Sequence, residues 1–112
     1  MLVQLSYAIG VVEPIGVFVN TYGKSKVKMS DGEIADKIAS LYDLRPAAIE
    51  KQLKLRKPIY SETASYGHMG RTPQTVKKTF TSQYFDDKII EVELFTWEKL
   101  DYVDTFIKAF NL

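Results

Sequence analysis

The sequence SDGEIADKIASLY, residues Ser30–Tyr42, decides the fold class because it contains a helix start followed by helical spacing. Ser30 and Glu33 match a capping box, in which the hydroxyl and the carboxylate each accept a hydrogen bond from a backbone N–H at the helix start. Apolar side chains then recur on one helical face: Ile34, Ile38, Leu41 and Tyr42. The stretch therefore predicts a helix from about Asp31 to Tyr42.

Two strand patterns precede this helix. From Leu2 to Ile9, large apolar side chains alternate with smaller or polar ones, which is the period of a β-strand. Gly10 and Pro14 end the first pattern. Residues Ile15 to Tyr22 are rich in Val, Phe and Thr, which favours a second strand. The large side chains of the first strand are expected on one face: Val3, Leu5, Tyr7 and Ile9.

A second helix is expected to begin at Arg45-Pro46, because proline is tolerated in the first helical turn. Its buried side would carry Ile49 and Leu53. Lys57-Pro58 should end it, since the residue before proline avoids the helical region. A short extended piece is then expected from Ile59.

The last third of the chain predicts a hairpin and a final helix. Residues 75–84 and 88–95 favour strands, with the turn at residues 85–87, and Thr96 is placed to cap the helix. The apolar face of that helix would hold Trp97, Leu100, Val103, Ile107 and Phe110. The order β-β-α-α-hairpin-α predicts an α+β, two-layer sandwich with helices on one face of a mostly antiparallel sheet.

Composition narrows the function classes. The chain has 112 residues, which fits one domain, and a net charge of +1, which gives no field to attract nucleic acid or a membrane surface. No apolar run approaches the ~18 residues of a membrane span, and the first residues do not form a signal peptide. The absence of cysteine excludes disulfides and fits a cytoplasmic protein. A single histidine argues against zinc.

Local chemistry alone leaves alternatives open. His68 could transfer protons or serve a structural role through hydrogen bonds to the backbone. Arg45, Arg56 and Arg71 could bind phosphate or carboxylate, or form surface ion pairs. The basic cluster at residues 24–28 favours a solvated loop over an ATP- or RNA-binding site. Asp86 and Asp87 favour solvated turn residues over a metal site.

Several sequence blocks together carry a resemblance to a known family. Each block is short, but they occur in the same order and at similar spacing from Val3 to Lys99. They are SYAIGV (residues 6–11), DLRP (43–46), LKLRKPIY (53–60), TASYGHMGR (63–71) and WEK (97–99). With these blocks in this order, the chain resembles the S-adenosylmethionine synthetases, which are also called methionine adenosyltransferases.

The resemblance implies an enzyme that joins ATP and methionine and releases phosphate and pyrophosphate, assisted by Mg²⁺ and K⁺, in a homo-oligomer. The His-Pro-Asp-Lys and glycine-rich motifs that handle phosphate in the family are absent here. The chain is therefore expected to be a single carboxyl-terminal domain over residues 1–112, inactive in isolation, with no catalytic or metal-binding residue and no bound ion. Residues 72–95 are expected to be a hairpin insertion.

One residue role follows from the resemblance. The isoleucine of SYAIG lies beside the substrate pocket in the family, so Ile9 is a candidate wall for methionine or the nucleoside; the alternative is a core position in the strand. A second hypothesis for the whole chain is a non-enzymatic binding or assembly module with the same fold. In either case an exposed apolar face with Val3, Leu5 and Tyr7 would favour association of copies.

Overall fold

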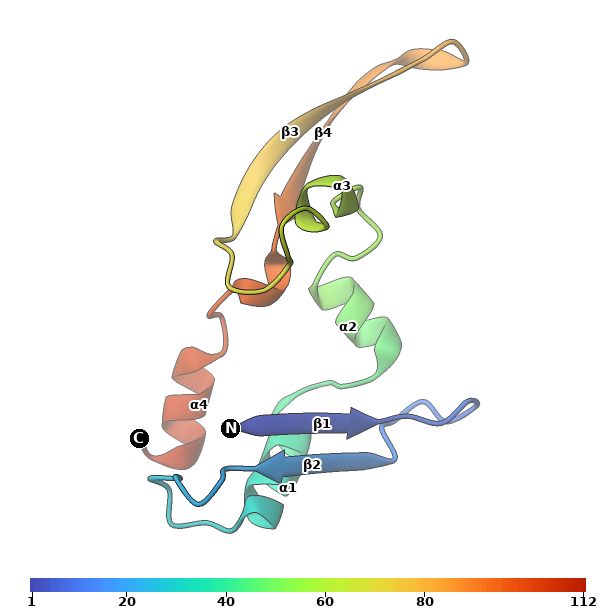
Figure 1. The fold of residues 1–112 in the computed structure, drawn as a ribbon. Helices are drawn as coiled ribbons and strands as arrows, with labels where there is room; N and C mark the ends of the chain where they lie inside the picture. The colour runs from blue at the N-terminus through green and yellow to red at the C-terminus, as the bar shows by residue number, and fades with distance from the viewer. The chain divides into compact units, whose positions relative to one another are not determined.

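The computed structural model describes residues 1–112 and confirms the α+β class (Figure 1). The elements are β1 (Leu2–Ser6), β2 (Gly16–Asn20), α1 (Asp31–Leu41), α2 (Pro46–Gln52), α3 (Tyr60–Thr63), β3 (Gln74–Ser82), β4 (Phe85–Leu94), the 3-10 helix η1 (Thr96–Glu98) and α4 (Val103–Phe110). Both strand pairs are antiparallel, and each forms its own two-stranded sheet. None of the helices combines the length and the apolar character needed to cross a membrane.

The chain divides into two compact units. Unit 1 contains residues 1–49 and 103–112, and unit 2 contains residues 50–102. Unit 1 therefore holds β1, β2, α1 and α4, whereas unit 2 holds α3, β3, β4 and η1.

In unit 1, β1 and β2 pair from Leu2 opposite Asn20 to Ser6 opposite Gly16. The first strand is shorter than the sequence predicts, because it ends at Ser6 and not at Ile9. The Ile15 N–H donates to the Ser6 carbonyl at 2.8 Å and closes the ladder there. Residues 7–15 then form a connection in which Gly10 has φ +84°, a conformation that glycine adopts without a steric penalty.

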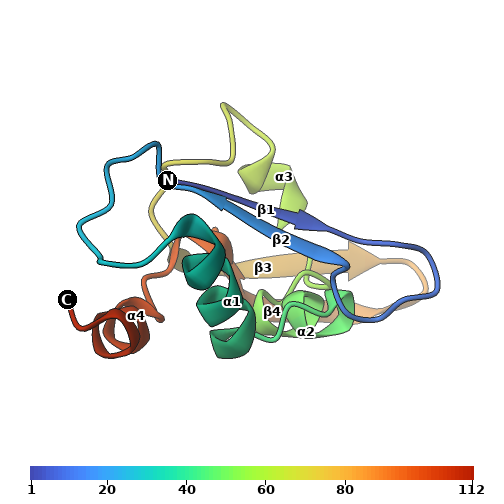
Figure 2. The same ribbon diagram turned by 90° about the horizontal axis from the view of Figure 1, so that it is seen from below.

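Helix α1 begins as the capping box predicts. The Glu33 N–H donates to the Ser30 hydroxyl oxygen at 3.3 Å, and the Ser30 N–H donates to the Glu33 carboxylate at 2.7 Å. The hydrogen bonds from Ser30 lower the pKa of Glu33. The helix lies against β2, as Figures 1 and 2 both show. The buried side chains of unit 1 are Val19, Ile34, Ala35, Ile38 and Phe110.

We expect Ser30→Ala to lower the free energy of unfolding of unit 1 by about 0.5–2 kcal/mol, the usual cost of losing an N-cap side chain. Amide hydrogen exchange in α1 measures the change. Ser40→Ala is the control, because the Ser40 hydroxyl donates to the Lys37 carbonyl within the helix and caps no free N–H. Equal loss of protection in the two variants would contradict the role of the cap.

The prediction of one last helix from Thr96 is wrong. Residues 96–98 form the short helix η1 in unit 2, and α4 begins only at Val103 in unit 1. The Thr96 hydroxyl donates to the Leu53 carbonyl at 2.7 Å and does not cap a helix. The predicted apolar face also differs, since Leu100, Val103 and Ile107 are exposed. The side chains of α4 that pack on the core are Phe106, Ala109 and Phe110.

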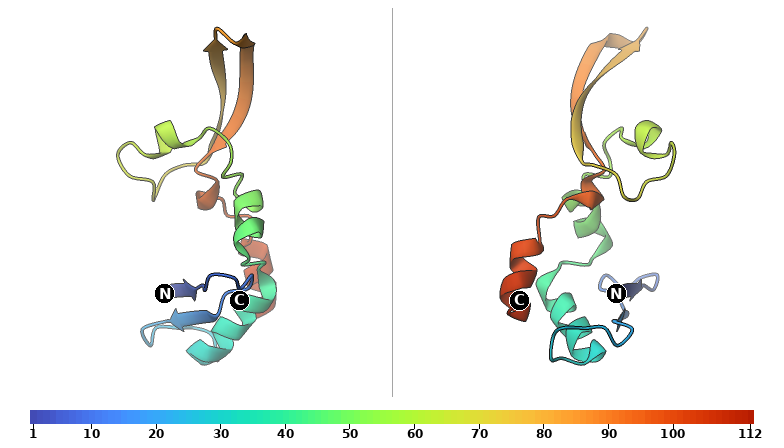
Figure 3. Two further views of the ribbon diagram at one scale, coloured as in Figure 1. Left: turned by 90° about the vertical axis from the view of Figure 1, so that its right-hand side faces the viewer. Right: turned by 60° about the vertical axis from the view of Figure 1, so that its left-hand side comes forward.

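In unit 2, β3 and β4 form the predicted hairpin, paired from Gln74 opposite Leu94. The turn lies at residues 83–84, so Phe85, Asp86 and Asp87 belong to β4 and not to the turn. No third strand pairs with either outer edge, and the ribbon extends well beyond α3 (Figures 1 and 3). The buried core lies at its base: Ile59, Val92, Leu94 and Phe95.

The stretch of chain that holds α2 and α3 departs from prediction at two points. Helix α2 starts at Pro46 as expected but ends at Gln52, and Lys54 adopts φ +53°. Ile49 and Leu53 are only half-buried. The extended piece expected from Ile59 is instead the short helix α3, in which the buried Thr63 hydroxyl donates to the Ile59 carbonyl at 2.9 Å.

Candidate functional site

The connection between β1 and β2 presents Ile9 to solvent. The Val11 N–H donates to the Ala8 carbonyl at 3.1 Å, so Ile9 and Gly10 occupy the two central positions of a tight turn. Ile9 is fully exposed, which contradicts the alternative that it is a core residue of the strand. The same connection exposes three further apolar side chains: Val11, Val12 and Ile15. The turn therefore offers an apolar surface held by its own backbone.

Two of the sequence blocks meet at this connection. The Tyr7 hydroxyl donates to the Leu44 carbonyl at 2.6 Å, which joins the SYAIGV block to the DLRP block. Within DLRP, the Arg45 guanidinium donates to both carboxylate oxygens of Asp43, at 2.8 and 2.5 Å. This fork lowers the pKa of Asp43 and raises that of Arg45, and the charge of Glu13 adds to the latter. Arg45 thus forms a surface ion pair, which is one of the two alternatives that the sequence left open.

Arg71 organises the TASYGHMGR block. Its Nη1 donates to the carbonyls of Ser65 and Gly67, both at 3.1 Å, and the guanidinium lies 4.7 Å from the centre of the Phe95 ring. Gly67 and Gly70 have positive φ angles of +85° and +68°, which glycine adopts without a steric penalty. The block is therefore a corner tied together by one arginine, which supports a folding role for Arg71.

A pocket of about 450 Å³ lies beside this corner and contains His68. The Trp97 indole N–H donates to the His68 carbonyl at 2.6 Å, but the imidazole ring makes no hydrogen bond. The other lining residues are Tyr60, Thr63, Ala64, Met69 and Trp97. The structure therefore engages His68 through its backbone carbonyl and leaves its side chain exposed.

An ion network that the sequence did not indicate lies at the base of the hairpin. The Glu93 carboxylate accepts from Lys54 at 2.7 Å and from Lys99. These two hydrogen bonds, with the charges of the lysines, lower the pKa of Glu93 from 4.5 to about 2. The three residues come from separate parts of unit 2, so no local motif could have indicated the network.

The Glu93 network predicts a pH dependence of stability. A carboxyl whose pKa is lower in the folded state stabilises the fold above its unfolded pKa of ~4.5, and this stabilisation is lost as pH falls toward 2. Glu93→Gln should therefore flatten the pH dependence of the unfolding free energy of unit 2 between these values, measured by urea titration at several pH values. Glu91→Gln is the control on the same strand, because Glu91 takes part in none of the ion pairs of the structure. An unchanged slope in Glu93→Gln would contradict the network.

The remaining candidates are surface features. Arg56 pairs with Glu50 at 2.5 Å on the surface, and Asp86 and Asp87 are exposed on β4. Residues 24–28 lie in the loop between β2 and α1. No three side chains of the His, Asp or Glu type converge on a position where they could hold a metal ion.

Comparison with known proteins gives consistent matches. A family model described as "S-adenosylmethionine synthetase, C-terminal domain" matches residues 1–82. Proteins named S-adenosylmethionine synthase align with the whole chain: 69% identical in Phocaeicola vulgatus, 70% in Bacteroides fragilis and 61% in Flavobacterium johnsoniae. The chain covers 26%, 26% and 27% of these relatives, respectively.

The chain thus spans about a quarter of the length of the curated relatives it matches. The family model ends inside the hairpin, whereas the relatives align through β4 and α4 as well. The family model covers residues 1–82, which is well over half of the chain. The chain belongs to the S-adenosylmethionine synthetase family and corresponds to its C-terminal domain.

Proposed function

We propose that this chain acts as one C-terminal domain, over residues 1–112, of an enzyme that forms S-adenosylmethionine from ATP and methionine with release of phosphate and pyrophosphate. The family match and the relatives named as synthases support this activity. In that enzyme Mg²⁺ and K⁺ assist the reaction and are bound outside this chain. The isolated chain is inactive and binds neither ion, because the motifs that handle phosphate in the family are not in it.

Ile9 forms an apolar wall for methionine or the nucleoside. The single observation that supports this role is the turn that holds Ile9 fully exposed within the SYAIGV block. Covering an exposed isoleucine with an apolar ligand is favourable, because it removes apolar surface from water. Methionine has an apolar thioether side chain that could do this. The backbone hydrogen bond across the turn fixes the position of the wall before the substrate arrives.

A domain exchange tests both the activity and the wall. This chain would replace the matching segment of the Bacteroides fragilis synthase, to which it is 70% identical. We expect the exchanged enzyme to form S-adenosylmethionine, as measured by mass spectrometry, and the isolated chain to form none under the same conditions. Turnover by the isolated chain would contradict its proposed inactivity, and an inactive but folded exchange enzyme would contradict the proposed function.

In the exchanged enzyme, Ile9→Ala should lower kcat/KM for methionine or ATP by about tenfold or more, because several apolar groups leave the pocket wall. Ile15→Ala is the matched control, since Ile15 is an exposed isoleucine in the same connection. Equal effects of the two substitutions would contradict a specific wall at Ile9.

The proposal includes a homo-oligomer in the cytoplasm, with residues 72–95 as a hairpin insertion. Exposed apolar side chains on the β1–β2 hairpin support the association of copies: Leu2, Val3, Tyr7 and Phe18. Light scattering of the purified chain should show a species larger than a monomer. A strictly monomeric species at high concentration would contradict the association.

A further inference from the structure

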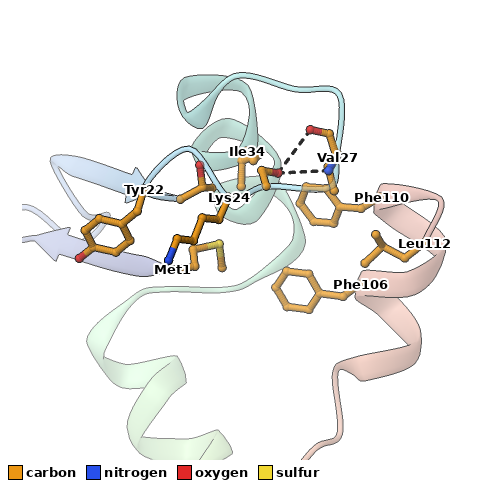
Figure 4. Close-up of a pocket in the computed structure, with 10 residues that line it drawn as sticks. Met1, Tyr22, Lys24, Val27, Ile34, Phe106, Phe110 and Leu112 are labelled. Carbon is orange, nitrogen blue, oxygen red and sulfur yellow. Dashed lines mark hydrogen bonds between the residues drawn. The ribbon is translucent and has the colours of Figure 1, made fainter.

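A second pocket, of about 440 Å³, lies in unit 1 between the loop after β2, helix α1 and helix α4 (Figure 4). Its size is within the range of small-molecule sites. None of the sequence blocks of the family resemblance contributes to it, because its lining lies outside those blocks. The lining residues are Met1, Thr21, Tyr22, Lys24, Ser25, Val27, Ile34, Phe106, Phe110 and Leu112.

One side of the pocket is apolar. Phe106 and Phe110 of α4 stack with their ring centres 5.5 Å apart and their planes 13° from parallel. Ile34 of α1 and Val27 of the loop complete this side, together with Leu112. Figure 4 shows the two rings projecting from α4 toward the loop. An apolar molecule of modest size would lose water contact on entering this space, which favours its binding.

The opposite side carries the ammonium group of one lysine, Lys24. Figure 4 shows the Lys24 side chain running beside Met1, across the pocket from α4. The Thr21 hydroxyl donates to Asp31 at 2.6 Å, and the Ser25 hydroxyl bonds the backbone of Val27, so both are engaged. Lys24 forms no ion pair, and no acidic side chain lines the pocket. Its ammonium group is therefore available to an incoming anion.

We propose that this pocket binds a small carboxylic acid with an apolar body. The body would lie against Phe106, Phe110 and Ile34, and the carboxylate would pair with Lys24. The ligand needs both a charged head and an apolar tail. A purely polar molecule would lose hydrogen bonds to water on the apolar side, and a purely apolar molecule would leave Lys24 without a partner. The same loop also carries Lys26 and Lys28, which do not line the pocket.

Octanoate and octan-1-ol test the proposal, because they share an apolar tail and differ in charge. Binding to the purified 112-residue chain would be followed by NMR of isotope-labelled Ile, Leu and Val methyl groups. We expect octanoate to shift the Ile34, Val27 and Leu112 signals in a saturable way and to bind more tightly than octan-1-ol. Lys24→Met should weaken octanoate binding about three- to tenfold and leave octan-1-ol binding unchanged.

Two controls make the outcome decisive. Lys26→Met removes a charge from the same loop without touching the pocket, and octanoate binding should change by less than twofold. Val27→Phe should block both ligands by filling the pocket, with folding checked on methyl signals of β1 and β2. Equal affinity for the two ligands, no effect of Lys24→Met, or shifts confined to the exposed face of β1 and β2 would each overturn the proposal.

Discussion

Phe95→Ala should lower the free energy of unfolding of unit 2 by about 3–5 kcal/mol, the largest effect expected from a single substitution in this chain. Phe95 is 1% exposed, and its ring meets Trp97 edge to face at a centroid distance of 5.8 Å. It also supports the guanidinium of Arg71. Alanine would leave a cavity and keep the unfavourable φ of +56°, so nothing offsets the loss.

Urea unfolding followed by the fluorescence of Trp97, the single tryptophan, measures this change within unit 2. Phe85→Ala is the matched control on β4, because Phe85 is 47% exposed and lies near the hairpin turn. We expect the control to cost less than about 1 kcal/mol. A cost for Phe95→Ala as small as that of Phe85→Ala would show that the ring does not hold the corner together.

Ile38→Ala should lower the free energy of unfolding of unit 1 by about 2–5 kcal/mol, because it removes a buried side chain from the contact of α1 with β2. Ile38 is 5% exposed and belongs to the core that includes Val19 and Phe110. Amide exchange in α1 and β2 reports the loss. Ile107→Ala, at a position of α4 that is 42% exposed, is the control and should cost far less. Similar losses of unfolding free energy in the two variants would show that Ile38 does not belong to the core of unit 1.

The parts of the fold that could be predicted are those set by local chemistry. The capping box fixed the start of α1, and alternation with glycine and proline located β1, β2 and the hairpin. The last helix could not be placed correctly. Trp97 and Phe110 fit one helical stripe in sequence, yet they belong to different compact units. Periodicity describes one element at a time and carries no information on which core receives each side chain.

The candidate site was predicted unevenly for a similar reason. Ile9 is a candidate only through the family block, and the strand pattern wrongly extended through it. The sequence suggested Arg71 only as a charge, whereas its two carbonyl partners and the Phe95 ring depend on how the corner folds. The neighbours of Glu93 in space are 39 and 6 residues away in sequence, so its network required the tertiary structure.

The hairpin of β3 and β4 has a consequence for how the protein behaves at high concentration. Both outer edges offer unpaired backbone groups, and such edges can recruit strands from other molecules into growing fibrils. Charged residues interrupt the apolar run along β4, with Asp86, Asp87 and Lys88 before Ile89 and Ile90, and Glu91 after them. These residues act as gatekeepers against fibril growth. Neutralising them would turn the ribbon into an aggregation-prone segment while leaving the core at its base intact.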